Sequence, residues 1–174
     1  LLSINAYPLD PALKLIEEGK IAHDKRHFNK AIKIFSRVIR MNSIDPEPYI
    51  LRAESHYELS QYKKAVQDLS ESLKRYSKSH RALRIRALCY LEIGRLRAAE
   101  SDIEQALRLD PRNYESLNIK ALLYYERGQY KKGINLANRS LKTFNNTDAY
   151  SIRGNCYYET EQFEKAIRDL SISL

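Results

Sequence analysis

The cysteine and histidine side chains are the first candidates for metal or redox chemistry, and their spacing argues against both. Cys89 and Cys156 are the only two cysteines, too few for a four-thiolate zinc site. They fall at the same position of an internal repeat but two repeats apart, so we expect buried free thiols and no disulfide. His23 and His27 are four residues apart, but no third ligand lies near them in the sequence. We therefore expect neither a metal ion nor a cofactor.

The sequence also lacks the usual signatures of catalysis. None of the five glycines belongs to a G-x-G-x-x-G pattern or a G-K-[ST] ending, which are the loops that cradle phosphates. No arrangement of nucleophile, base and acid is apparent either. We therefore expect that the protein is not an enzyme.

The composition indicates a folded helical protein. The 174 residues are 43% hydrophobic and 30% charged, as in ordinary globular proteins. Few glycines and prolines, and no Asn-Gly or Asp-Gly turns, favour helices over strands. No apolar run reaches the roughly 18 residues of a membrane-spanning helix. We therefore expect no membrane insertion. Because the chain has only two cysteines, we expect the protein to be located in the cytoplasm or another reducing intracellular compartment.

An internal repeat runs along the chain and must position any functional residue. The motif aromatic-x-x-Ala recurs with small changes, and its last residue is number 31, 65, 99, 133 and 166, in steps of 34, 34, 34 and 33. Apolar residues within each repeat have helical spacing, as in Ile32, Phe35 and Ile39. We expect two helices per repeat, at about positions 2 to 14 and 18 to 31 of each repeat. After a lead-in at 1–11, the expected repeats are residues 12–45, 46–79, 80–113, 114–146 and 147–174.

The repeat resembles the tetratricopeptide repeat family. The resemblance rests on small residues at positions 8 and 20, a large apolar or aromatic residue at position 17, and Leu109-Asp110-Pro111 near the end of the third repeat. The family's Trp at position 4 is Leu or Tyr here. The resemblance implies an all-α, right-handed superhelical solenoid of antiparallel helix pairs, with five units and the last one truncated. It also implies a non-catalytic scaffold for protein–protein interaction.

In this family the first helix of each repeat lines a concave groove, at positions 2, 5, 9, 12 and 13. Acids outnumber bases nine to three at these positions, although the whole chain carries a net charge of +8. We therefore expect the groove to bind a basic or partly apolar segment of another protein, with tyrosines supplying contact area. The expected partner-binding residues are Glu54, Tyr57, Glu58, Arg84, Leu88, Glu92, Asn118, Leu122, Tyr125, Glu126, Asn155, Tyr158 and Glu159.

Position 13 is acidic in all five repeats, and two explanations are open. The acids could face a ligand in the groove. They could equally pair with bases in the following turn, such as Lys25, Arg95 or Arg127.

Positions 7 and 23 vary together. Repeats with Arg at position 7 have Asp at position 23, and repeats without the Arg also lack the Asp. This joint occurrence predicts a structural ion pair between the two helices of a repeat. The predicted pairs are Arg52 with Asp68, Arg86 with Asp102, and Arg153 with Asp169.

Two other functions are open alternatives. Chaperone adaptors of this family grip acidic C-terminal peptides through Lys, Asn and Arg positions, but the matching residues here are Ile16, Lys20, Leu51, Arg81 and Ile85. Only Arg81 has suitable chemistry.

The second alternative is binding of RNA or an anionic surface through basic residues outside the groove. Lys30, Lys33, Arg37 and Arg40 could contact phosphates, although solvated surface charge explains such residues more simply, so we do not expect nucleic acid to be the partner. Self-association through exposed ends of the array is a further possibility.

Overall fold

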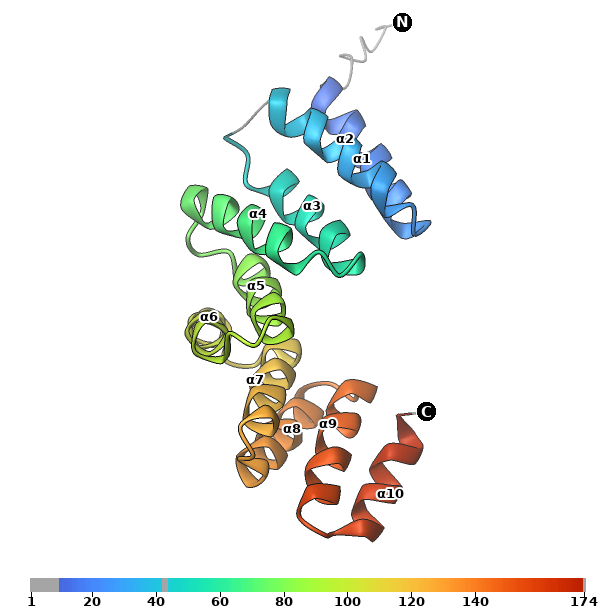
Figure 1. Ribbon diagram of the computed structural model, residues 1–174, viewed down its shortest axis with the longest axis vertical. Coiled ribbons are helices and arrows are strands. Elements are labelled where there is room, and N and C mark those ends of the chain that lie inside the picture. The colour runs from blue at the N-terminus through green and yellow to red at the C-terminus, as the bar shows by residue number, and fades with distance from the viewer. Residues whose placement is uncertain (1–9, 42–43, 174) are drawn as a thin grey trace, which may run out of the picture. The chain divides into compact units, whose positions relative to one another are not determined.

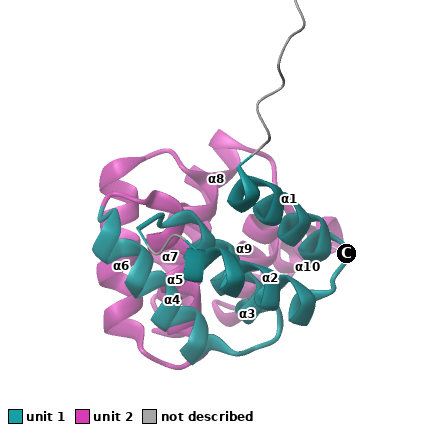
Figure 2. Ribbon diagram, turned by 90° about the horizontal axis from the view of Figure 1, so that it is seen from above, with its two compact units in different colours: residues 1–77 teal, residues 78–174 magenta. Residues whose placement is uncertain are grey.

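The protein is all-helical throughout the part of the chain that the structure describes. The computed structural model describes residues 10–41 and 44–173, so most of the expected lead-in at 1–11 lies outside the described residues, as do residues 42, 43 and 174. The two helices of each repeat are connected by a short turn (Figure 1). The chain divides into two compact units, residues 1–77 and 78–174 (Figure 2). The predicted all-α class is confirmed.

The described residues of the first unit form four helices, each packed on the next along the chain. α1 also contacts α3, so these two helices lie side by side. The buried side chain of Phe35 packs with Ala22, Ala31, Ile34 and Leu51 in a core shared by α1, α2 and α3. The helices are α1 (Pro11–Asp24), α2 (Phe28–Met41), α3 (Glu47–Glu58) and α4 (Tyr62–Arg75).

The second unit continues the same pattern with six helices. α7 contacts both α5 and α9, and it packs between α6 and α8 along the chain. Leu117, Ala121, Leu136 and Ala137 form a buried cluster between α7 and α8. The helices are α5 (His80–Glu92), α6 (Leu96–Leu109), α7 (Tyr114–Glu126), α8 (Tyr130–Thr143), α9 (Thr147–Glu159) and α10 (Phe163–Ile172).

Side-chain caps set the starts of four of the odd-numbered helices. The residue before each helix is Asp10, Ser79, Asn113 or Asn146, and its side-chain oxygen accepts a hydrogen bond from a backbone N–H in the first turn, at 2.8 to 3.2 Å. Such caps satisfy backbone donors that have no partner inside the helix. Short polar residues at these points in the sequence therefore determine where the helices begin.

The turn within each helix pair has the same backbone conformation. One residue of every turn has a positive φ, namely Arg26 (59°), Ser60 (56°), Gly94 (71°), Gly128 (69°) and Glu161 (60°). Glycine adopts this left-handed region without steric strain, whereas the region is sterically unfavourable for residues with a Cβ atom. The turn geometry is thus imposed by the packing of the two helices even where the sequence supplies no glycine.

Each of the three predicted Arg–Asp pairs is present as a bidentate ion pair. The Arg Nε donates to one carboxylate oxygen and Nη2 donates to the other, a geometry that gives strong, directional pairing. The N–O distances are 2.8 and 2.6 Å for Arg52 with Asp68, 2.7 and 2.8 Å for Arg86 with Asp102, and 2.6 and 2.8 Å for Arg153 with Asp169.

Arg52 and Arg153 also bind the preceding helix pair. Arg52 Nη1 donates to Ser36 Oγ on α2 at 2.9 Å, and Arg153 Nη1 donates to Asn138 Oδ1 on α8 at 2.5 Å. In α7 the corresponding side chain is Lys120, and its Nζ lies 3.3 Å from Glu104 Oε1 on α6. The basic residue therefore links neighbouring helix pairs even where the Asp is missing.

No described helix has both the length and the apolar character that crossing a bilayer would require.

Candidate partner-binding site

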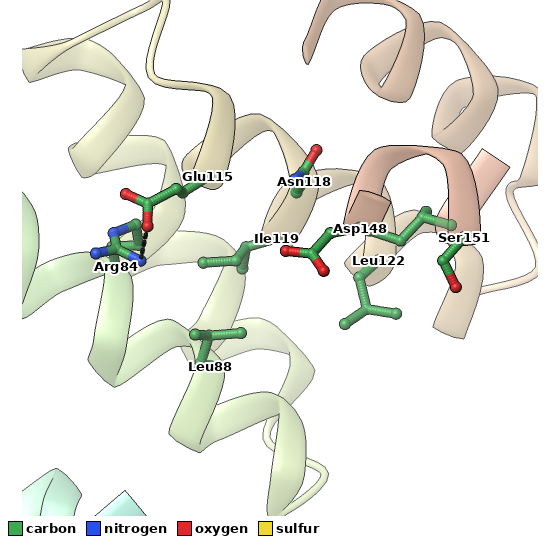
Figure 3. Close-up of a pocket in the computed structure, with 9 residues that line it drawn as sticks. Arg84, Leu88, Glu115, Asn118, Ile119, Leu122, Asp148 and Ser151 are labelled. Carbon is green, nitrogen blue, oxygen red and sulfur yellow. Dashed lines mark ion pairs between the residues drawn. The ribbon is translucent and has the colours of Figure 1, made fainter. Parts of the chain in front are cut away.

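A pocket of about 290 Å³ lies between α5, α7 and α9 in the second unit. Four aliphatic side chains, Leu88, Ile119, Leu122 and Ile152, supply its apolar lining. Its polar lining consists of Arg84, Glu115, Asn118, Asp148 and Ser151 (Figure 3).

Helical spacing explains why these side chains converge. Arg84 and Leu88 are four residues apart on α5, as are Asn118 and Leu122 on α7, so each pair shares one helix face. Asp148 lies in the first turn of α9, and Ser151 follows it three residues later. Three neighbouring helices thus present one face each to the same pocket.

An ion pair closes one end of the pocket. Arg84 Nη1 lies 3.0 Å from Glu115 Oε1, which connects α5 to α7 (Figure 3). Arg84 is largely buried, with 18% of its side chain exposed, and its Nε is buried without a hydrogen-bond partner among the described residues. The charge of this arginine is balanced by Glu115, so this end is electrically close to neutral.

The middle of the pocket contains the carboxylate of Asp148, while the polar group of Asn118 is buried in its wall. Asn118 is 5% exposed; its amide nitrogen donates to Asn146 Oδ1 at 2.8 Å, while its own Oδ1 is buried with no donor within the described part of the chain. The Asp148 carboxylate points toward the space beside Ile119 and Leu122 (Figure 3), and none of its neighbours among the described residues forms an ion pair with it. The Asn118 oxygen has almost no accessible surface, so a ligand does not reach it, whereas Asp148 is exposed. The region beside Asp148 is therefore suited to a ligand that carries a positive charge.

The pocket includes four of the predicted partner-binding residues, Arg84, Leu88, Asn118 and Leu122. It also includes Ile119 and Ile152 at position 6 of their repeats, which are not among the predicted groove positions. The sequence contains a signal for them, because position 6 is apolar in every repeat except the first. Position 6 also lies on the same helix face as groove positions 2 and 9.

The other predicted partner-binding residues do not line this pocket. Those of the first unit are on α3, and those of the second unit are nearer the C-terminal ends of α5, α7 and α9 than the pocket residues are. They are Glu54, Tyr57, Glu58, Glu92, Tyr125, Glu126, Asn155, Tyr158 and Glu159.

The three tyrosines at position 12 pack against the first residue of the following helix. The ring-centre distances are 5.4 Å for Tyr57 with Tyr62, 5.7 Å for Tyr125 with Tyr130, and 5.7 Å for Tyr158 with Phe163. Such edge-on and tilted arrangements are favourable for aromatic rings. These tyrosines therefore help to hold the turn, and Tyr158 still has 60% of its surface exposed.

The acids at position 13 are exposed, and one of the proposed turn partners is engaged elsewhere. Arg127 pairs with Glu100 on α6 at 2.8 Å, and this contact raises the pKa of Arg127 and lowers that of Glu100. Within the described residues, neither Glu92 nor Glu126 forms an ion pair. Both carboxylates are available to a ligand from the ends of α5 and α7.

The two cysteines and His23 have structural surroundings. Cys89 and Cys156 are buried free thiols, and burial raises their pKa values to about 12 and about 11. His23 Nδ1 lies 3.0 Å from Ser55 Oγ. Among the residues described, no group of three or more His, Cys, Asp or Glu side chains is placed to hold a metal ion.

Comparison with solved structures shows how widespread this architecture is. TTC0263, a thermophilic TPR protein from Thermus thermophilus, is 17% identical with a TM-score of 0.83, over 94% of this chain and 90% of that one. A tetratricopeptide repeat protein from Parabacteroides merdae is 20% identical with a TM-score of 0.82, over 95% of this chain and 66% of that one. A chain of the APC/C hetero-tetramer Cut9–Hcn1 is 15% identical with a TM-score of 0.89, over 94% of this chain and 33% of that one. At these identities the likeness concerns the fold.

Sequence comparison identifies the family. No curated protein sequence matches the chain. The family model described as "Anaphase-promoting complex, cyclosome, subunit 3" matches residues 24–106 and 98–171, which together span most of the chain. The predicted membership of the tetratricopeptide repeat class is confirmed, and within it the chain belongs to the family of anaphase-promoting complex, cyclosome, subunit 3.

Proposed function

We propose that the protein is a non-catalytic interaction scaffold, and that its second unit binds a segment of another protein on the face formed by α5, α7 and α9. The pocket between these helices would anchor the segment. Its aliphatic lining suits an apolar side chain, and a concave, mostly apolar site with a few fixed polar groups is typical of ligand sites.

The observation that carries this proposal is the pairing of an apolar floor with an unpaired carboxylate. Asp148 lies beside Ile119 and Leu122 and forms no ion pair with the described residues, whereas Arg84 is already matched by Glu115. The pocket therefore favours a cationic side chain next to an apolar one. A Lys or Arg of the partner would donate to the Asp148 carboxylate while its neighbour fills the aliphatic lining.

Exposed carboxylates on the same helices support the same partner chemistry. Glu92, Glu126 and Glu159 lie at the ends of α5, α7 and α9, and all three are exposed. Rim charges mainly accelerate the encounter of oppositely charged surfaces. The predicted acidic, tyrosine-containing groove is thus part of the proposal, with the pocket as its anchor.

The chaperone-adaptor alternative is less favoured by the same pocket. A terminal carboxylate needs several converging donors, and among the described residues the one cation that lines the pocket, Arg84, is paired with Glu115. Acidic peptides would also meet the unpaired charge of Asp148.

The test is to select peptides that bind the immobilised protein from a displayed random library, and then to measure the affinity of the enriched peptides, made synthetically, by calorimetry. We expect enriched peptides to contain Arg or Lys next to an aliphatic or aromatic residue. Asp148→Asn should weaken their binding about tenfold or more, because a hydrogen bond to a charged group contributes about 1.5–3 kcal/mol.

Glu164→Gln is the matched control. Glu164 is the second residue of α10, as Asp148 is the second residue of α9, so both variants remove one acid from the same helical position. We expect Glu164→Gln to leave peptide affinity unchanged. Enrichment of acidic peptides, or equal affinity of the wild type and Asp148→Asn, would rule out this mode of binding.

A further inference from the structure

A second pocket of the second unit has the opposite charge. It has a volume of about 450 Å³ and lies between the α6–α7 loop and the end of α8. None of its described lining residues is acidic. They are Pro111, Arg112, Leu117, Arg139, Lys142 and Thr143.

Two parts of the fold bring the three cations together. Arg139 and Lys142 are three residues apart in the last turns of α8, so they share one face of the helix. Arg112 comes from the loop before α7, where its backbone N–H donates to Asp110 Oδ1 at 3.1 Å. This short-range hydrogen bond fixes the loop and directs the Asp110 carboxylate toward the backbone of Arg112.

The equivalent place in the first unit provides an internal comparison. α4 and α8 both have 14 residues, and the tenth residue is Glu71 in α4 but Arg139 in α8. Glu71 pairs with Lys74 at 2.6 Å and with Arg75 at 2.9 Å. In α4 the basic residues at the helix end are therefore neutralised by an acid of the same helix.

In α8 this acid is replaced by a further base. Within the described part of the chain, Arg112, Arg139 and Lys142 form no ion pair. The helix dipole favours basic residues in the last turn of a helix, which accounts for Lys142. It does not account for a second base on the same face and a third from the loop, since like charges at this spacing repel one another.

We infer that this pocket binds a phosphate group carried by a phosphoserine or phosphothreonine of a protein segment. Arg112 and Arg139 supply planar guanidinium groups that can each donate two hydrogen bonds to phosphate oxygens, and Lys142 adds a third positive charge. Pro111 and Leu117 provide an apolar wall against which the rest of the modified side chain packs.

The pocket suits one phosphorylated side chain better than a nucleic acid. Nucleic-acid binding proteins gain affinity by neutralising several phosphates along a strand, whereas three cations line a single pocket here. The site shares no residue with the pocket between α5, α7 and α9, so it does not depend on the function proposed for that face.

The experiment uses two libraries of random peptides, one centred on phosphoserine or phosphothreonine and the other on the unmodified residue. The full chain is applied to both, and the best phosphopeptides are measured by fluorescence anisotropy at fixed salt. We expect removal of the phosphate to weaken binding at least tenfold, and Arg139→Glu to do the same.

Arg37→Glu is the matched control, because Arg37 is the tenth residue of α2 as Arg139 is of α8. Both variants change the net charge equally, and Arg37→Glu should preserve phosphopeptide affinity. Arg112→Ala provides a second variant that leaves the helices unaltered, and far-ultraviolet circular dichroism checks folding. Asp148→Asn should bind the phosphopeptides as the wild type does.

Three results would overturn the inference. Unmodified peptides could bind as tightly as phosphopeptides, or Arg37→Glu could lower affinity as much as Arg139→Glu does, which would indicate bulk charge. In the third result, single-stranded polyuridylate binds more tightly than every phosphopeptide and displaces the phosphopeptides. This result would identify the pocket as part of a nucleic-acid surface.

Discussion

Removing the carboxylate of Asp68 should destabilise the first unit strongly. Asp68 is almost buried, with 9% of its side chain exposed, and it accepts two hydrogen bonds from Arg52, whose side chain is 21% exposed. In Asp68→Ala the guanidinium keeps its bond to Ser36 Oγ at 2.9 Å. It loses both bonds to the carboxylate and stays largely shielded from water.

We expect Asp68→Ala to lower the free energy of unfolding by about 3 kcal/mol. Breaking a buried ion pair by removing one partner costs about 3–5 kcal/mol, and the partial exposure of Arg52 places this pair at the lower end. Arg52→Ala should cost a similar amount, because among the described residues Asp68 would then have only the imidazole of His56, with Nε2 3.9 Å away.

A double-mutant cycle separates the pair from its surroundings. Because each single variant leaves one unpaired charge, the double variant should cost about 2 kcal/mol less than the sum of the two. Urea unfolding followed by circular dichroism measures these free energies, and hydrogen exchange in α3 and α4 locates the loss. Additive costs, within about 0.5 kcal/mol, would show that the two side chains do not stabilise each other. Lys74→Ala, which removes an exposed ion pair on α4, is the control and should change little.

Three further predictions concern pH, turns and packing. Burial lowers the pKa of His56 and of His80 below the ordinary 6.5 in the folded protein. As the pH falls below 6.5, the unfolded chain therefore binds more protons than the folded protein does, and the folded protein loses stability. The urea midpoint should drop below pH 6.5 and remain constant above it, and His56→Gln and His80→Gln should flatten this profile. Ser60→Gly should raise thermal stability slightly, by at most about 1 kcal/mol at the melting temperature, because it relieves a positive φ of 56° but adds freedom to the unfolded chain; a lower melting temperature would contradict this. A Cβ atom at Gly133 would lie 2.9 Å from Cys156 Sγ, so Gly133→Ala should lower the free energy of unfolding, measured with urea, by about 1–3 kcal/mol. Adding Cys156→Ala should recover part of that loss. If it recovers nothing, the clash is with another atom.

The parts of the fold that sequence predicts best are those repeated several times. Helical spacing and the 34-residue period predict the helices, and the joint occurrence of Arg52 with Asp68 and of Arg153 with Asp169 predicts contacts across a pair of helices. Both are local to a single repeat. The link from Lys120 to Glu104 was not predicted, because it crosses to the preceding repeat and occurs only where the usual Asp is absent.

The candidate site was predictable only in part for a similar reason. Positions on one face of a helix can be read from spacing, and four residues predicted in this way, Arg84, Leu88, Asn118 and Leu122, line the pocket. The depth of the pocket, the neutralisation of Arg84 by Glu115 and the orphaned oxygen of Asn118 depend on how three helices approach one another. No periodicity within a single helix contains that information.

The bridging basic residue has a consequence for how such an array can be rearranged. Arg52 meets a serine on the preceding helix, Arg153 meets an asparagine, and Lys120 meets the carboxylate of Glu104. The helix pair that contains Lys120 would lose its counterion if recombination placed it after α2, where Ser36 occupies that place. Repeats of the same length are therefore not fully equivalent, and an order that separates Lys120 from Glu104 would lose a partly exposed ion pair, which contributes about 0.2–1 kcal/mol.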